Sequence, residues 1–208
     1  MKYLILATGR DGSTQLLHAI HDRLESQNMG EPYTKVSEPY NYDLGVKTDF
    51  MKRNIVVKCI VNKYHIPESW SPEDGDAIDF FTGLALNFDK TILFRRKNKG
   101  ERLYSALHAH KHNTWEGEYK QKPITLDSNN LTDEIDDFID AEIIAHELSK
   151  SFLTIYMEDL YTEDKELSQK TWNRIFPDEP VQIFESMYNK YLDVKHKKGK
   201  VWKNLQVI

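Results

Sequence analysis

The protein has 208 residues, a net charge of −5 and a single cysteine, Cys59. A chain of this length buries roughly two-thirds of its unfolded surface, so we expect one domain over residues 1–208 that needs no disulfide and suits a reducing compartment, the cytoplasm. The acidic balance argues against general nucleic-acid binding, and the apolar runs are too short for a signal-peptide core or for membrane insertion.

Apolar runs alternate with segments of helical periodicity along most of the chain. The predicted strands are Lys2–Ala7, Ile55–Val61, Lys90–Phe94 and Phe152–Tyr156. The predicted helices contain Leu16, Leu17, Ile20 and Leu24, then Leu103 and Leu107, and finally Leu131–Lys150. This alternation predicts an α/β fold with a parallel sheet covered on both faces. The polar segments Gln27–Tyr42 and Asn113–Asn130 are predicted to be loops over the sheet.

The turn after the first strand contains several groups that bind anions. It reads Thr8-Gly-Arg-Asp-Gly-Ser-Thr14, with two glycines, a cation and the hydroxyls of Ser13 and Thr14. Glycines let backbone N–H groups approach a phosphate, and the helix N-terminus adds a partial positive charge. The plainer alternative is an ordinary turn with Ser13 as the N-cap. A nucleoside-triphosphate P-loop is excluded because it needs a lysine where Gly12 stands.

The same segment resembles the 5′-phosphosulfate loop of sulfotransferases that use 3′-phosphoadenosine 5′-phosphosulfate (PAPS). Arg10, Gly12, Ser13 and Thr14 match the basic, glycine and hydroxyl positions of that loop. The resemblance implies that the 5′ end of PAPS is bound by Gly9, Arg10, Asp11, Gly12, Ser13 and Thr14. Asp11 departs from the family pattern, which usually has a small uncharged residue there. A carboxylate beside a phosphosulfate would repel it unless the carboxylate is turned away.

A second anion motif follows the third predicted strand. The segment Thr91–Ser105 carries a cluster of basic residues and ends on a serine in the next helix, and it resembles the family's 3′-phosphate motif. The resemblance implies that Arg96 and Ser105 bind the 3′-phosphate, a role that suits the planar donors of arginine. Because the spacing is one residue longer than usual, Arg95 or Arg102 is an alternative to Arg96. A solvated basic helix start is the plainer interpretation of this cluster.

Three further segments extend the resemblance. Ser105–Trp115 looks like the bacterial branch that sulfates sugars such as trehalose, and Tyr156–Leu160 is similar to the family's Tyr-Glu-Asp-Leu segment. The tail His196–Asn204 resembles the C-terminal Lys-Gly…Trp-Lys loop that closes over the cofactor, although the Gly-Asp before the tryptophan is missing. A frayed basic terminus is the alternative for the tail.

Two residues are candidates for the general base that deprotonates the acceptor. Glu38, in Ser37–Tyr40, resembles the base of the sugar-directed branch. His65, in Lys63–Pro67, resembles the histidine base of cytosolic sulfotransferases, and we favour Glu38 over it.

Lys58 interrupts an apolar strand and is costly to bury without an anionic partner, so it is a candidate for contacting the sulfate or the leaving oxygen. A lysine that extends to solvent from a sheet edge is the alternative.

Taken together, the resemblance implies a three-layer α/β/α fold like that of the P-loop nucleotide kinases. The implied function is transfer of a sulfuryl group from PAPS to a hydroxyl of a carbohydrate or other small-molecule acceptor, with adenosine 3′,5′-bisphosphate as product. His108, His110 and His112 also suggest a metal site, but they lack the ligands of an established zinc pattern, so we expect no metal. The alternatives are a noncatalytic adenosine-nucleotide-binding module and a P-loop-like small-molecule kinase, which would need magnesium ligands that the sequence does not display.

Overall fold

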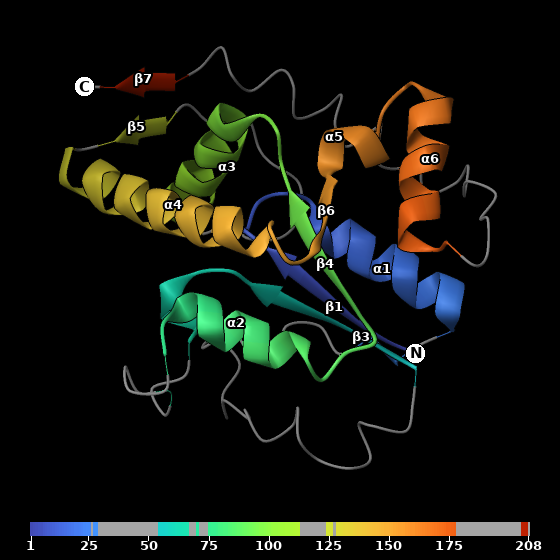
Figure 1. The fold of residues 1–208 in the computed structure, drawn as a ribbon. Coiled ribbons are helices and arrows are strands. Elements are labelled where there is room, and N and C mark those ends of the chain that lie inside the picture. The colour runs from blue at the N-terminus through green and yellow to red at the C-terminus, as the bar shows by residue number, and fades with distance from the viewer. Residues whose placement is uncertain are drawn as a thin grey trace. The chain divides into compact units, whose positions relative to one another are not determined.

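The computed structural model describes residues 1–25, 27–28, 54–66, 70, 75–112, 124–126, 128–177 and 205–207. The elements in chain order are β1 (Lys2–Ala7), α1 (Ser13–Leu24), β2 (Gln27–Asn28), β3 (Ile55–Ile60), the 3₁₀-helix η3 (Lys63–His65), α2 (Ala77–Ala85), β4 (Lys90–Arg95), α3 (Lys99–His112), β5 (Ile124–Leu126), α4 (Ser128–Leu148), β6 (Leu153–Tyr156), α5 (Met157–Leu160), α6 (Lys165–Ile175) and β7 (Leu205–Val207) (Figure 1). The four predicted strands and three predicted helices are therefore confirmed.

The two segments predicted to be loops contain regular structure, and those predictions are wrong in part. β2 lies within the first segment, while β5 and the first turn of α4 lie within the second. β2 has two residues and β5 has three, so neither is long enough to produce a periodic pattern in the sequence. Each exists because it pairs with a strand elsewhere in the chain: β2 with β3, and β5 with β7.

The chain divides into two compact units. The first consists of Met1–Arg95 and Asp140–Ile155, and the second of Arg96–Ile139 and Tyr156–Ile208. The chain therefore passes between the units three times, once within helix α4.

The first unit is built on a five-stranded sheet with the order β2-β3-β1-β4-β6 (Figure 1). The pairings of β1 with β3, β1 with β4 and β2 with β3 are parallel, which confirms the α/β fold with a parallel sheet. The chain moves from β1 to one side of the sheet and later returns to the other side, so β1 lies where the strand order reverses. In open α/β sheets, ligands bind beyond the carboxyl ends of strands at such a point.

Both faces of the central strand β1 are apolar. Leu4 and Leu6 of β1 belong to a core cluster with residues of α2 and α4. Side chains alternate along a strand, so Tyr3, Ile5 and Ala7 face the other side, where α1 contacts β1 and β3. The helix α1 buries Leu16, Leu17, Ala19 and Ile20. Because both faces of β1 are covered, the strand reads as an uninterrupted apolar run.

The second unit contains a parallel pair of short strands and several helices. β5 pairs with β7, with Ile124 opposite Leu205. α5 and α6 contact each other, and the Ser168 hydroxyl donates a hydrogen bond of 2.6 Å to the Leu160 carbonyl. The Trp172 ring stacks on Phe176 with centroids 6.2 Å apart. Among the described residues, no helix combines the length and apolarity that crossing a membrane requires.

Candidate functional site

The loop between β1 and α1 has an unusual backbone. Gly9, Arg10 and Gly12 have positive φ angles of 75°, 53° and 85°, and Gly12 is the N-cap of α1. Glycine adopts this conformation without steric cost, whereas a residue with a Cβ is strained by about 1–3 kcal/mol, as Arg10 is here. Turns of this kind direct backbone N–H groups into a concave anion site. The loop therefore has a backbone of the kind from which anion-binding turns are built.

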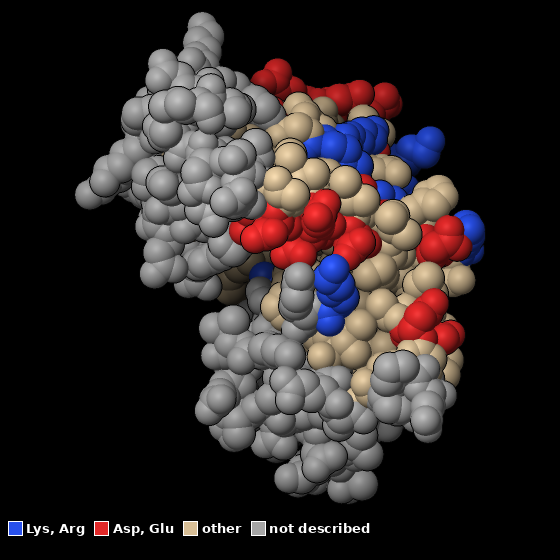
Figure 2. All heavy atoms as spheres, turned by 90° about the vertical axis from the view of Figure 1, so that its left-hand side faces the viewer, with Lys and Arg blue, Asp and Glu red and all other residues tan. Residues whose placement is uncertain are grey.

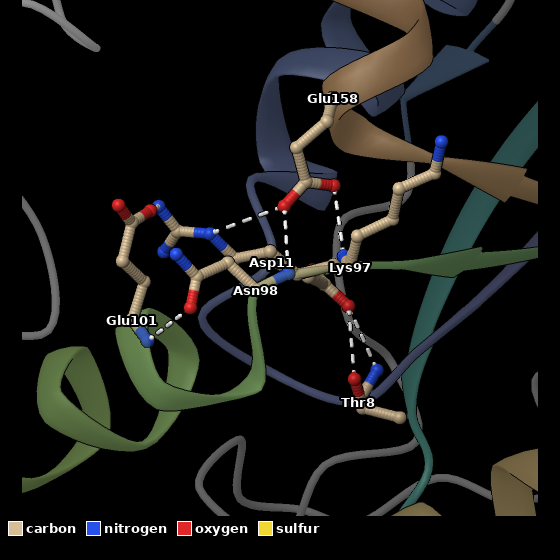
Figure 3. A network of polar contacts seen from close by, with 7 residues as sticks. Thr8, Asp11, Lys97, Asn98, Glu101 and Glu158 are labelled. Atoms are coloured by element: carbon tan, nitrogen blue, oxygen red, sulfur yellow. Dashed lines mark hydrogen bonds and ion pairs between the residues drawn. The ribbon is translucent and has the colours of Figure 1, made fainter.

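Asp11 is fully buried and is bonded to the backbone of this loop. Its Oδ2 atom accepts hydrogen bonds from the Thr8 N–H at 2.8 Å and from the Thr8 hydroxyl at 3.4 Å (Figure 3). Its Oδ1 atom accepts the Ser13 N–H at 3.2 Å. Asp11, the residue that departs from the family pattern, thus links Thr8 at the start of the loop to Ser13 at its end.

Lys58 reaches the same loop from the neighbouring strand. In β3 it lies opposite Ile5, on the face of the sheet that α1 covers. Its side chain is buried, with 6% of the residue exposed, and its Nζ donates a hydrogen bond of 2.8 Å to the Thr14 hydroxyl. The interruption of the apolar strand therefore has a local explanation, because the ammonium group is directed at the start of α1 instead of extending to solvent.

His65 lies in η3, directly after β3, and is half-buried. Because β1 and β3 are parallel, the segments that follow their carboxyl ends lie at the same edge of the sheet. The hydrogen bond from the Val61 N–H to the Ala7 carbonyl, 2.7 Å long, joins these two ends. His65 and the loop after β1 are thus on the same edge, whereas Glu38, the favoured base, lies outside the described residues. Trp115 and the tail at 196–204 also lie outside them.

In the second unit, Arg96 is held by carboxylates. It is 8% exposed, forms an ion pair with Glu101, and has its Nε 3.9 Å from Glu158 Oε1. Glu158 also accepts the N–H groups of Lys97 at 2.8 Å and Asn98 at 3.0 Å, just before α3 begins (Figure 3). An anionic group therefore already sits at the N-terminus of α3, next to the arginine predicted to bind phosphate.

Ser105 and the alternative arginines have distinct surroundings. Ser105 lies within α3 and is partly exposed. Arg95 is paired with Glu142, with Nη2 and Oε2 2.6 Å apart. Arg102 is 3% exposed, and its guanidinium carbon lies 3.9 Å from the centroid of the Phe138 ring. The choice among the three arginines stays open, since each has a partner of its own.

Sequence reasoning missed the acidic partners of these basic residues. Glu101, Glu142 and Glu158 were not singled out as charge partners, although Glu158 belongs to the segment that resembles Tyr-Glu-Asp-Leu. Glu142 and Glu158 are 47 and 62 residues from Arg95 and Arg96 in sequence, beyond the reach of any local pattern. Figure 2 shows acidic and basic side chains interspersed over the described part of one face. The described residues contain no group of three or more side chains suited to a metal ion.

No protein-family model and no curated protein sequence matches the chain. Among solved structures, the chain is similar to the mouse sulfotransferase SULT7A1 complexed with PAP, with a TM-score of 0.54 and 11% sequence identity. The match covers 91% of this chain and 62% of that one, so the chain spans less than two-thirds of its structural neighbour. This likeness gives no support to the expected relation to the bacterial sugar-directed branch. At this identity it establishes the architecture alone: the protein has the fold of the sulfotransferases.

Proposed function

We propose that the protein is a PAPS-dependent sulfotransferase that acts on a hydroxyl group of a carbohydrate or other small molecule. The observation that carries the proposal is the left-handed loop after β1, with the buried Lys58 donating to Thr14 at 2.8 Å, on a sulfotransferase fold. A turn with left-handed residues and a buried ammonium group next to one helix N-terminus form an arrangement suited to binding an anion. PAP in the structural neighbour supports a nucleotide of this class as the ligand.

The residues of the loop suit the 5′ end of PAPS. Apart from the Ser13 N–H, which donates to Asp11, the backbone N–H groups of the loop and the hydroxyls of Ser13 and Thr14 are the proposed hydrogen-bond donors to phosphate oxygens. Arg10, which is partly exposed, and Lys58 supply positive charge. Cations held near the bridging oxygen stabilise the charge that develops on the leaving phosphate. The loop thus provides both the binding and the electrostatic stabilisation that the reaction needs.

The proposed reaction is a single in-line displacement. The acceptor oxygen forms a bond to the sulfur while the bond between the sulfur and the bridging oxygen of the 5′-phosphosulfate breaks. The base, Glu38 or His65, takes the proton of the acceptor hydroxyl, and adenosine 3′,5′-bisphosphate leaves with the electron pair of the broken bond. The protein contributes mainly positioning and charge stabilisation. In this proposal no metal takes part.

The proposed ligands of the 3′-phosphate are Arg96 and Ser105. The carboxylates of Glu101 and Glu158 compensate the charge of Arg96, so a phosphate must compete with them for the guanidinium group. The affinity for the 3′-phosphate is therefore expected to be lower than an uncompensated arginine would provide. This competition also favours the second candidate, a noncatalytic adenosine-nucleotide-binding module, which would bind the bisphosphate without any turnover of PAPS.

Calorimetric titration with adenosine 3′,5′-bisphosphate tests the proposal, with adenosine 5′-monophosphate and Mg-ATP as comparison ligands. We expect the bisphosphate to bind more tightly than either of them, and Ser105→Ala or Arg96→Ala to remove that preference. A preference for Mg-ATP, or no binding of the bisphosphate, would contradict the sulfotransferase proposal. Binding without sulfuryl transfer across a panel of hydroxyl acceptors would favour the noncatalytic module.

Lys58→Met tests the contribution of the buried cation. Because methionine has a flexible side chain of similar length and removes the cost of burying an ammonium group, the variant is expected to fold. Loss of a charge-assisted hydrogen bond predicts bisphosphate binding about 10- to 100-fold weaker. Lys150→Met is the matched control, since Lys150 is an exposed lysine paired with Glu147 after α4. Unchanged affinity in Lys58→Met, with the control also unchanged, would remove Lys58 from the site.

A further inference from the structure

Asp11 places a carboxylate inside the loop proposed to bind the phosphosulfate. Both of its oxygens accept hydrogen bonds, as expected of an ionised carboxylate. The donors are the N–H groups of Thr8 and Ser13, and Ser13 is the first residue of α1. The N–H group at the very start of α1 is therefore directed to the protein's own carboxylate.

The position of this carboxylate gives it two effects. It fixes the distance between the two ends of the loop, because a single side chain is bonded to Thr8 and Ser13. It also places a negative charge within three residues of every residue of the loop Thr8–Thr14. Because Asp11 is fully buried, water screens this charge poorly. The loop is thus an anion site that contains an anion of its own.

The donor and product of the proposed reaction differ in charge at the atom that the loop would hold. In PAPS the 5′-phosphorus is part of a mixed anhydride: its own oxygens carry one negative charge, and the sulfate, one bridging oxygen farther out, carries a second. After the sulfuryl group leaves, the 5′-phosphate is a monoester that carries about 1.5 to 2 negative charges at pH 7. The 3′-phosphate is common to both molecules. A fixed carboxylate that is nearer to the phosphorus than to the sulfur would therefore repel the product more than the donor, because the product gathers on one phosphate the charge that the donor divides between phosphate and sulfate.

We propose that Asp11 is a specificity-determining residue that makes the loop bind the phosphosulfate donor in preference to its desulfated product. The proposal rests on the proposed sulfotransferase function and deepens it: the departure from the family pattern promotes release of adenosine 3′,5′-bisphosphate. In this proposal the positive charges of Lys58 and Arg10 offset the negative charge of Asp11, so that an anion can bind. The charge of Asp11 then determines whether the donor or the product binds more tightly.

The test compares the dissociation constants of PAPS and adenosine 3′,5′-bisphosphate for the full chain, without acceptor, in the wild type and in Asp11→Asn and Asp11→Ser. The ratio of the two constants cancels the contribution of the shared 3′-phosphate. We expect the wild type to bind PAPS about tenfold or more tightly than the bisphosphate, and both variants to reduce that preference about tenfold. Asp22→Asn, an exposed charge removal on α1, is the matched control and should leave the ratio unchanged.

The possible outcomes separate the inference from the function on which it rests. If the wild type binds neither ligand, the proposed function fails and the inference fails with it. If both ligands bind with equal affinity to the wild type, or if the variants weaken both ligands in parallel, Asp11 only holds the loop together and the specificity proposal is wrong. Thermal melting of each variant shows whether the fold is kept, and the wild-type ratio tests the proposal even if both variants fail to fold.

Discussion

At the scale of single residues, three buried charges each have a specific partner. Asp11 accepts backbone N–H groups, Lys58 donates to the Thr14 hydroxyl, and Arg95 pairs with Glu142. Burying a charge without such a partner costs several kcal/mol, and removing one member of a pair leaves the other uncompensated. Variants that remove only Glu142 are therefore expected to be more disruptive than variants that replace Arg95 and Glu142 together.

The burial of Tyr104 makes the stability of the fold depend on pH in the alkaline range. Burial within α3 raises the pKa of its phenol above the ordinary value near 10, because the charged form loses solvation. The folded state therefore retains a proton that the unfolded state releases. The stability that this retention contributes is complete below about pH 10 and is lost as the pH rises through the folded-state pKa.

Tyr104→Phe removes this ionisable group. We expect the free energy of unfolding of the variant to fall less steeply than that of the wild type as the pH rises above about 10. Urea unfolding at a series of alkaline pH values measures the two slopes, and Tyr156→Phe, at a half-exposed tyrosine, is the control. Identical slopes in Tyr104→Phe and the wild type would show that the buried phenol has no part in alkaline unfolding.

At the scale of elements, α2 shows how local chemistry defines a helix start. Asp76 accepts the N–H groups of Ile78 at 2.7 Å and Asp79 at 3.0 Å, and the Asp79 side chain accepts the Asp76 N–H at 3.1 Å. This reciprocal pair is a capping box with an aspartate in the position usually held by glutamate or glutamine. The cap directs Phe80, Phe81 and Leu84 into the core against the sheet.

Asp76→Ala is expected to lower the free energy of unfolding by about 1 kcal/mol, since it removes the acceptor for two N–H groups. Asp76→Asn is the matched variant, because asparagine keeps an oxygen acceptor and is an equally good N-cap. Urea unfolding followed by circular dichroism measures both values. An equal loss in the two variants would mean that the negative charge at Asp76, and not the cap geometry, stabilises α2.

The start of α3 depends on a more distant residue. Asn98 caps the helix by accepting the Glu101 N–H at 3.0 Å, which the sequence could suggest. Glu158, from α5, accepts the two preceding N–H groups of Lys97 and Asn98. Lys97 in turn approaches Asp159, with the two charged atoms 2.5 Å apart. The segment similar to Tyr-Glu-Asp-Leu therefore has a visible structural role, which is to hold the turn between β4 and α3.

At the scale of the whole molecule, the first unit is assembled from two distant parts of the chain. Its core cluster joins strand residues of the N-terminal part with Ile144, Ala145 and Leu148 of α4. Arg95, the last residue of β4, forms an ion pair with Glu142 of α4. The sheet is also completed by β6, which neighbours β4. The N-terminal part therefore lacks one side of its core and an edge strand when taken alone.

A fragment comprising residues 1–95 is expected not to fold cooperatively. It would expose the apolar surface that α4 covers and would leave Arg95 without its carboxylate. Thermal melting followed by circular dichroism measures this, with the full chain as reference. A sharp melting transition of the isolated fragment would contradict the expectation and would show that β1, β3, β4, α1 and α2 form an independent core.

Local chemistry in the sequence determined the four main strands, the three main helices and the glycine-containing turn after β1. These features depend on periodicity and on glycine positions within a few neighbouring residues, which a sequence displays directly. The prediction of a parallel α/β sheet followed from their alternation and is confirmed. The roles of Glu38, His65, Arg96 and Ser105 stay predictions.

Only the tertiary structure decided which charges meet. Lys58 and Thr14 are 44 residues apart, and Arg96 and Glu158 are separated by 62. The short strands β2, β5 and β7 likewise exist only through pairing with distant segments. The physical reason is that ion pairs and strand pairing depend on which elements the fold brings together. The neighbours of a residue in sequence determine its backbone preference, but they do not determine which distant residue its charge pairs with.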